Sequence, residues 1–253
     1  MLLEEGHIYS YSQLEQMDSC PYGYYMQRIE HVDETDNAFA QQGSLIHELI
    51  DEWAKGELPA NQLVTAYRLR YPDEVTAAWP IFLASKGYAD KTYQQGLDYF
   101  TNFDEFQGYK IIGTEQKFVM ELLGRPFQGI IDMILEESDG KLILLDHKSK
   151  SLSSFRKNQD TMYRQLYIYA KYIYDQYHKW PDKLVFNLFK EGGKKMERLF
   201  NEEEYKQTLD WAEKTMNKIE SFDEIDFLET RKSDFYCWEL CSVRDNCPNG
   251  NQK

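Results

Sequence analysis

Residues 129–150, GIIDMILEESDGKLILLDHKSK, contain two apolar runs with a turn between them. Phe127 to Glu136 is rich in β-branched and apolar residues, which predicts a strand. Ser138-Asp139-Gly140 predicts a hairpin turn, because glycine accepts the positive φ that such turns need. The returning run, 141–148, is apolar on both faces, as is typical of a fully buried central strand. The stretch therefore predicts an antiparallel hairpin at the centre of a sheet.

Charged residues interrupt this hairpin at positions where a core strand would be apolar. Asp132 lies inside the first strand, and Asp146 and Lys148 end the second. Because alternate residues of a strand share a face, Asp146 and Lys148 point the same way and His147 points oppositely. Carboxylates beside each other at the end of a buried strand repel unless a positive charge lies between them. We therefore expect a divalent cation here.

Composition narrows the class of protein. With 253 residues, 42% hydrophobic and 15% aromatic, the chain can bury a substantial core. No apolar run reaches membrane-spanning length, and the N-terminal residues lack the basic and apolar regions of a signal peptide, so we expect a cytoplasmic protein without a membrane partner. The net charge of −14 argues against broad non-specific coating of DNA, although it permits a local basic groove.

Helical patterns precede the hairpin. From Gly43 to Trp53, apolar residues recur every three or four positions, which predicts an amphipathic helix with His47 near its apolar stripe. Near the N-terminus, Ser12 and Glu15 have the spacing of a capping box. Residues at about 55–106 predict several helices without obvious chemistry, and we interpret them as a helical insert.

A second helical pattern follows the hairpin. Gln159 to Tyr177 predicts a strongly aromatic helix, on which Gln165 and Tyr169 share a face because they are four residues apart. Ser151 to Asn158, between hairpin and helix, is expected to be a loop. Since we find no internal repeat and no low-complexity linker, residues 1–253 are expected to form a single domain.

Taken alone, each polar residue has an ordinary structural interpretation. His47 could be a hydrogen-bonded histidine at a helix boundary, and Asp132 a paired buried carboxylate. Glu115, in a strand predicted at Tyr109–Leu122, is either a residue of a metal site or a surface strand residue. The ordered series, however, runs from His47 through Gly129-x-x-Asp132 and Asp146-x-Lys148 to Gln165-x-x-x-Tyr169, and is far less expected by chance.

This series resembles the PD-(D/E)XK nuclease superfamily, and specifically its RecB-like branch, which includes the AddB nuclease domain and the CRISPR-associated iron–sulfur nucleases. The resemblance implies an α/β, restriction-endonuclease-like core, with a central mixed sheet flanked by helices. It further implies four ligands for Mg²⁺ or Mn²⁺, namely the side chains of His47, Asp132 and Asp146 and the backbone carbonyl of His147. Lys148 would position or activate the attacking water, while Gln165 and Tyr169 would support the site and the DNA strand. The branch commonly has Glu where this chain has Asp146, which shortens the reach to the metal.

Elementary chemistry agrees with these implied roles. Oxygen ligands suit Mg²⁺ and Mn²⁺, and one imidazole shifts the preference toward Mn²⁺. Lys148, partly desolvated beside a cation, is expected to have a lowered pKa and to act in proton transfer.

The cysteines form a second constellation. Cys237-x3-Cys241-x5-Cys247 is compact, and Cys20 is the only other cysteine. Four thiolates complete the ligand set of a [4Fe–4S] cluster or of a zinc ion, and unpaired buried thiols are the other interpretation. The arrangement resembles the iron–sulfur members of the branch, in which one cysteine precedes the nuclease core and three follow it. A cluster would join Cys20 to the segment 235–248. Those members usually have two residues between the first two trailing cysteines, whereas this chain has three.

Basic residues gather after the hairpin and are candidates for DNA contact: Lys150, Arg156, Lys157 and Arg164. A solvated loop and helix face is the competing interpretation. The resemblance implies a DNA exonuclease that hydrolyses phosphodiesters at single-stranded ends. It would act in recombination, repair, phage replication or CRISPR spacer acquisition, with a helicase, recombinase or CRISPR adaptation partner. One alternative is a non-catalytic iron–sulfur subunit that binds DNA ends or assembles a larger helicase–nuclease complex. Another is a redox-sensing iron–sulfur protein.

Overall fold

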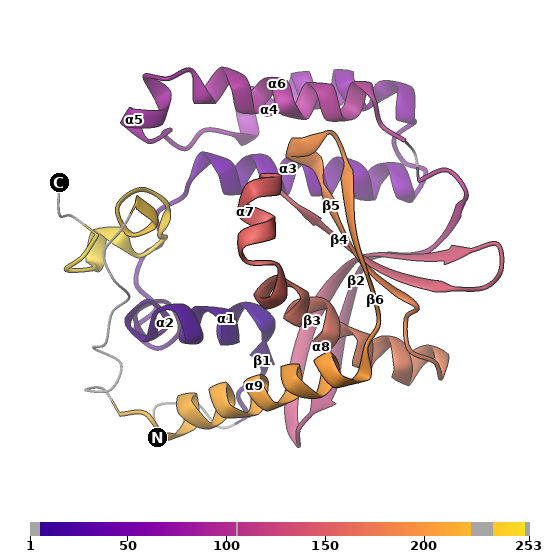
Figure 1. Ribbon diagram of the computed structural model, residues 1–253. Coiled ribbons are helices and arrows are strands. Elements are labelled where there is room, and N and C mark those ends of the chain that lie inside the picture. Colours follow the sequence, from indigo (N-terminus) through magenta and orange to yellow (C-terminus); the bar gives the residue numbers. More distant parts are fainter. Residues whose placement is uncertain (1–5, 105, 224–234, 251–253) are drawn as a thin grey trace. The chain divides into compact units, whose positions relative to one another are not determined.

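The computed structural model describes residues 6–104, 106–223 and 235–250 (Figure 1). The chain divides into two compact units. Unit 1 comprises residues 1–37, 119–129 and 206–253, and unit 2 comprises residues 38–118 and 130–205. The single domain expected over 1–253 stays a prediction.

A mixed β-sheet forms the centre of unit 2. Strand β3 (Arg125–Glu137) runs antiparallel to β4 (Leu142–Lys148), and β4 runs parallel to β5 (Lys183–Leu188). β5 pairs antiparallel with β6 (Lys194–Leu199), and β2 (Tyr109–Leu122) pairs with β3. The α/β class and the mixed sheet predicted from the sequence are confirmed.

The central hairpin follows the sequence prediction. Gly140 has a φ of +83°, and its N–H donates to the carbonyl of Glu137 to close the turn. Six of the seven residues of β4 are buried, and only Lys148 at its end is partly exposed. The register pairs Met133 with Leu145. Continuing it by one residue places Asp132 beside Asp146.

Unit 2 has a group of helices before β2: α3 (Ala38–Ala54), η1 (Ala60–Gln62), α4 (Leu63–Glu74), α5 (Ile81–Ala84) and α6 (Tyr88–Thr101). α3, α4 and α6 lie side by side, and residues of all three belong to the core cluster on one face of the sheet (Figure 1). Apolar residues of α3, including Leu45 and Leu49, share a core cluster with Met133 and Leu145 of the sheet. This face of the hairpin is therefore covered by the predicted amphipathic helix and the predicted helical segment.

The parallel pair β4 and β5 is joined by α7 (Leu152–Lys157) and α8 (Gln159–Tyr177). Phe155 of α7 and Tyr163 of α8 lie 5.3 Å and 5.1 Å from the ring of Phe186 on β5, so these helices pack against the sheet. The loop expected over residues 151–158 is wrong. Ser151 caps a short helix by accepting the N–H of Ser154, and burial of Phe155 holds that helix in place.

Unit 1 contains β1 (Tyr9–Ser10), α1 (Tyr11–Ser19), α2 (Pro21–Arg28), most of α9 (Glu202–Ser221), η4 (Tyr236–Leu240) and η5 (Arg244–Asn246). β1 pairs in parallel with the start of β3, where Tyr9 stands opposite Phe127. The predicted capping box is wrong, because Ser10 rather than Ser12 caps α1 and accepts the N–H of Gln13. In the described part of the chain, no helix has both the length and the apolar character required to span a membrane.

Candidate functional site

A cavity of about 750 Å³ lies in unit 2 at the end of the central hairpin. One face of α3 lines it with residues spaced by three or four positions: Ala40, Gly43, Ser44, His47, Glu48 and Asp51. Strands β2, β3 and β4 contribute Glu115, Asp132, Asp146 and Lys148, and α8 contributes Gln165. The structure therefore brings together His47, both aspartates, the lysine and the glutamine that the sequence analysis selected.

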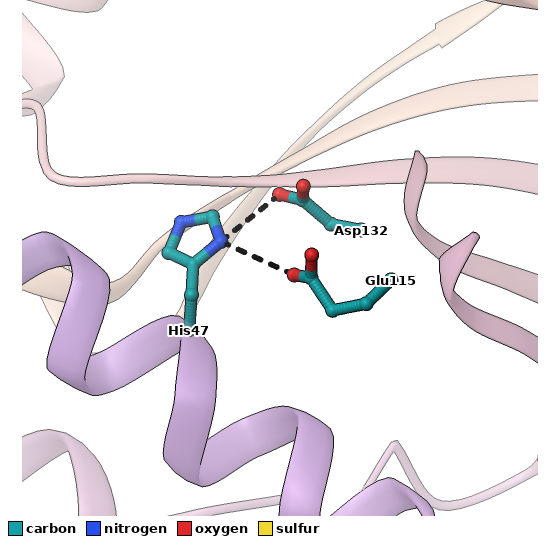
Figure 2. A group of neighbouring side chains, drawn as sticks. All are labelled: His47, Glu115 and Asp132. Carbon is teal, nitrogen blue, oxygen red and sulfur yellow. Dashed lines mark ion pairs between the residues drawn. The ribbon is translucent and has the colours of Figure 1, made fainter. Parts of the chain in front are cut away.

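Three of these side chains form a group that could hold a metal ion (Figure 2). One ligand atom from each of His47, Glu115 and Asp132 lies within 4.8 Å of the others. Nδ1 of His47 is 3.5 Å from Asp132 Oδ2 and 3.8 Å from Glu115 Oε1. Glu115, left undecided by the sequence, thus faces the same space as the two predicted ligands.

A local departure from strand geometry brings Glu115 to the site. Thr114 donates to Asp51 on α3, and the next residue, Glu115, lies beside His47 on that helix as well. In a regular strand, consecutive residues would point to opposite faces. Glu115 has a φ of +41°, in the left-handed region that non-glycine residues rarely adopt, and this interrupts the alternation.

His47 is oriented by the backbone of β4. Its Nε2 lies 3.1 Å from the carbonyl oxygen of His147, while its Nδ1 faces the two carboxylates. Metal-binding histidines commonly donate their second ring N–H to a carbonyl in this way. Burial lowers the pKa of His47, but the charge of Asp132, the side chain of Glu115 as a hydrogen-bond acceptor and the charge of Asp146 outweigh it, and the net shift is upward. The predicted role of the His147 carbonyl as a metal ligand stays a prediction, because that oxygen here contacts His47.

Asp132 is a largely buried carboxylate whose pKa is raised. Burial, together with the negative charge of Asp146, raises its pKa to about 7. The charges of His47 and Lys148 and the N–H of His147, which donates to Asp132 Oδ2 at 2.7 Å, oppose this rise only partly. This is the carboxylate repulsion that the sequence led us to expect.

Asp146 is held by Lys148 and Gln165. Its Oδ1 accepts hydrogen bonds from Lys148 Nζ at 3.1 Å and from Gln165 Nε2 at 2.9 Å, and Lys148 also donates to Gln165 Oε1. Lys148 Nζ lies 2.8 Å from Asp146 Oδ2, an ion-pair contact without hydrogen-bond geometry. Oδ2 is therefore a buried carboxylate oxygen with no hydrogen-bond donor among the described residues.

These donor groups fit a divalent cation. They offer an imidazole nitrogen, two carboxylates close to it, and in the same cavity Oδ2 of Asp146, which accepts no hydrogen bond from the described residues. Carboxylate oxygens are the preferred ligands of Mg²⁺ and Mn²⁺, and a histidine is compatible with Mn²⁺.

The lowered pKa predicted for Lys148 is wrong for the protein without a bound cation. Burial does lower it, but the charges of Asp146 and Asp132 and the hydrogen bond to Asp146 outweigh burial and raise the pKa. The sequence analysis counted desolvation and the expected cation, and it omitted the two aspartates that attract the proton.

Tyr169 lies behind the site. It is buried, and its ring meets that of Phe118 edge-on at 5.1 Å. Burial and the charge of Asp146 raise its pKa to about 12, although a hydrogen bond with Gln165 opposes the shift. Tyr169 is thus a neutral phenol next to Gln165, and its predicted support of the DNA strand stays a prediction.

A buried polar network that the sequence analysis missed holds His147. Asn187 of β5 stands opposite His147, and its Nδ2 lies 2.9 Å from both His147 Nδ1 and the hydroxyl of Tyr99. Burial keeps the pKa of His147 well below its ordinary value, so Nδ1 accepts the hydrogen bond from Asn187. A single asparagine within the otherwise apolar run LVFNLF of residues 184–189 was the available signal.

The four predicted DNA-binding residues lie after β4: Lys150 beyond its end, Arg156 and Lys157 in the last turn of α7, and Arg164 on α8. The described lining of the site cavity contains none of the four, whereas it includes Lys55 and Lys117. Lys55 is paired with Asp51 at 2.6 Å. The DNA contacts of the predicted residues stay predictions.

All four cysteines line a second, small cavity of about 40 Å³ in unit 1. Cys20 caps α2 by accepting the N–H of Gly23, and Cys237 is buried. Burial raises the pKa of Cys241, and the three other thiols add to the rise. In the described part of the chain, only His47, Glu115 and Asp132 form a group of three within 4.8 Å, so no three of the thiols lie as close together as the ligands of one zinc ion, which are each about 2.3 Å from the metal.

The sequence profile of the PD-(D/E)XK nuclease superfamily matches residues 8–248. No curated protein sequence matches the chain. A solved structure, described as a candidate exonuclease from Eubacterium rectale, is 12% identical, covers 97% of this chain and 93% of its own, and has a TM-score of 0.52, which shows a shared fold. The structure of SSO0001 is 17% identical over 74% of this chain and 85% of that chain, and its TM-score of 0.32 supports no further comparison.

The family match covers nearly the whole chain, including every residue that lines the site cavity. The mixed sheet flanked by helices is consistent with a restriction-endonuclease-like core. The chain belongs to the PD-(D/E)XK nuclease superfamily.

Proposed function

We propose that the protein is a metal-dependent DNA exonuclease of the RecB-like branch that hydrolyses phosphodiesters at single-stranded ends. The observation that carries this proposal is one cavity in which His47, Asp132 and Asp146 face each other beside Lys148. A protein that only binds DNA ends has no need to keep two carboxylates, one buried and one largely buried, close together, because they repel each other and the phosphate.

His47, Asp132 and Asp146 would hold Mg²⁺ or Mn²⁺, and Glu115 would add a third carboxylate. The bound ion would lower the pKa of a water molecule and neutralise charge that develops on the phosphate. If the carbonyl oxygen of His147 also binds the ion, its contact with Nε2 of His47 would have to break.

Lys148 would position the attacking water or a phosphate oxygen. Asp146 and Gln165 anchor its ammonium group, and its raised pKa keeps it protonated near neutral pH. A protonated lysine donates hydrogen bonds and cannot take up a proton, so the geometry favours positioning and charge stabilisation over general-base action.

For the cysteines we propose a structural [4Fe–4S] cluster rather than zinc. Its support is that all four thiols line one cavity, and that the order of one cysteine before the core and three after it resembles the iron–sulfur members of the branch. Anaerobic purification should give brown protein containing iron and sulfide, and a colourless, zinc-loaded protein would refute the proposal.

The implied setting is recombination, repair, phage replication or CRISPR spacer acquisition, with a helicase, a recombinase or a CRISPR adaptation protein as partner. The support for this part of the proposal is the resemblance of the motif series to the RecB-like branch.

The test is cleavage of end-labelled single-stranded and duplex DNA in the presence of Mn²⁺ or Mg²⁺. Asp146→Asn should reduce the rate by about a hundredfold or more, because loss of even an indirect support of a metal ligand costs about 10–100-fold. Asp139→Asn, which changes an exposed aspartate of the hairpin turn, is the control and should retain the wild-type rate. Wild-type protein as inactive as Asp146→Asn would instead favour a non-catalytic end-binding subunit.

A further inference from the structure

A lysine and two aromatic side chains lie next to the site cavity in unit 2. Lys190 belongs to η2 (Phe189–Glu191), and its Nζ stands 4.4 Å from the centre of the Phe39 ring. The ring of Trp79 meets Phe39 edge-on at 4.7 Å. All three side chains are partly exposed. We refer to Lys190, Phe39 and Trp79 as the Lys190 cluster.

Chain connectivity places the Lys190 cluster beside the cavity. Phe39 directly precedes Ala40, where the cavity-lining face of α3 begins, and Lys190 directly follows Phe189, which also lines the cavity. The cluster therefore adjoins the end of the cavity formed by the start of α3.

Hydrogen bonds fix both supporting segments. Gln41 accepts the N–H of Ala77 at 2.8 Å, which ties the segment carrying Trp79 to α3. Gln95 of α6 donates to the carbonyl of Lys190 at 3.2 Å, which holds η2. The cluster is thus anchored on both sides before any ligand arrives.

Lys190 is a partly buried lysine without a counter-charge among the described residues. Lys148 and Lys55 are paired with Asp146 and Asp51. No carboxylate among the described residues lies within ion-pair distance of Lys190, and its Nζ makes no hydrogen bond to them. Lys117 of the cavity lining also has no ion pair among these residues, but it is exposed, whereas Lys190 is partly buried. Burial alone lowers its pKa to about 8. A partly buried, unpaired ammonium is costly, and an anion would offset that cost.

We propose that the Lys190 cluster binds the single-stranded DNA that leads into the site. This inference rests on the proposed nuclease function. Lys190 would contact a backbone phosphate, and Trp79 with Phe39 would stack against a base. Single-stranded nucleic acids are commonly held by such combinations of cations and aromatic faces. In a chain with a net charge of −14, a local cation without a carboxylate partner is also where a phosphate meets least repulsion.

Binding of fluorescent oligothymidylate in the presence of a chelator tests the cluster without cleavage. Lys190→Met keeps the length of the side chain and removes its charge. The slope of log affinity against log salt should fall in magnitude by about 0.7, the value for one phosphate contact on a single strand. Lys110→Met is the matched control, because Lys110 is already paired with Glu136 at 3.3 Å, and it should leave the slope unchanged.

An abasic oligonucleotide of the same length separates the two contacts. Trp79→Leu should weaken binding of oligothymidylate by roughly tenfold, since stacking of one base contributes about 1–3 kcal/mol, and should leave abasic binding unchanged. Lys190→Met should weaken both. Melting temperatures of all variants report whether the fold is intact.

The outcomes distinguish this inference from the proposed function. If wild-type protein cleaves DNA while Lys190→Met keeps the wild-type salt slope in a folded protein, the cluster is not a phosphate contact. If Trp79→Leu weakens the affinity for oligothymidylate and for the abasic oligonucleotide equally, the stacking contact is overturned. If the binding changes occur as expected but wild-type protein cleaves no DNA, the nuclease proposal fails and the binding surface stands.

Discussion

His147 serves the site through its backbone, while its side chain is buried on the other side of the strand. Its N–H donates to Asp132 and its carbonyl oxygen contacts His47, so one residue orients two candidate ligands. The ring is held by Asn187, which also contacts Tyr99. Because these hydrogen bonds hold the ring of His147 in place, they also hold the N–H and the carbonyl of His147 in the positions that contact Asp132 and His47.

Asn187→Leu should therefore weaken Mn²⁺ binding by about tenfold, the lower end of the range for groups that orient metal ligands. Isothermal titration with Mn²⁺ measures the affinity. Asn102→Leu, at an exposed helix end, is the control. Wild-type Mn²⁺ affinity in a folded Asn187→Leu protein would show that the network does not orient the ligands.

The pH dependence of stability follows from Asp132 and His47. The pKa of Asp132 is raised to about 7 from an unfolded value of about 3.9, so between these values the folded state holds a proton that the unfolded state lacks. Stability of the ion-free protein should fall as pH rises through this window and level off above about 7. The raised pKa of His47 acts in the same direction.

Thermal melting in a chelator at pH 5.5 and 7.5 measures this effect, with a higher melting temperature expected at the lower pH. Asp132→Asn should reduce the difference. Mn²⁺ should stabilise the protein more at the higher pH, because bound metal requires ionised Asp132 and neutral His47. An equal difference in wild type and Asp132→Asn would contradict the assignment to Asp132.

At the scale of elements, the site depends on one irregularity in β2. The positive φ of Glu115 lets Thr114 and Glu115 both reach α3. Asparagine tolerates this conformation better than most residues, whereas a β-branched residue does not.

Glu115→Asn should therefore keep stability and reduce Mn²⁺ affinity, because it removes a carboxylate. Glu115→Val should in addition destabilise the protein by about 1–3 kcal/mol through backbone strain. Urea unfolding and Mn²⁺ titration separate the two effects. Unchanged metal affinity in Glu115→Asn would remove Glu115 from the metal site.

What could be predicted from the sequence depended on how local its physical signal was. The central hairpin was predictable because its turn and apolar runs are contiguous, and Asp132, Asp146 and Lys148 were found because they break that pattern. Glu115 stayed ambiguous, since its orientation depends on a backbone angle that strand periodicity does not encode. Asn187 and Lys190 were missed because their contacts join residues 40 or more positions apart.

At the scale of the whole molecule, charge limits how DNA can be held. The chain carries 43 acidic and 29 basic residues, and two lysines of the site cavity, Lys55 and Lys148, are already paired with carboxylates. Few cations are left to replace counterions on DNA. Binding should be weak and involve few phosphates.

Affinity for oligothymidylate, measured in a chelator over a range of salt concentrations, should follow a slope of about −1 to −3, equivalent to a few phosphate contacts. The measurement uses the wild-type chain. A slope steeper than about −5 would indicate an extensive basic surface and contradict the interpretation that contacts are local.

The central claim is that His47, Asp132, Asp146 and Glu115 share one cation site beside Lys148. Anomalous diffraction from a crystal grown with Mn²⁺ tests it most directly. We expect a manganese peak bonded to His47, Asp132 and Asp146, with Glu115 facing it. A manganese peak elsewhere, with these four side chains unbound at saturating Mn²⁺, would contradict the account.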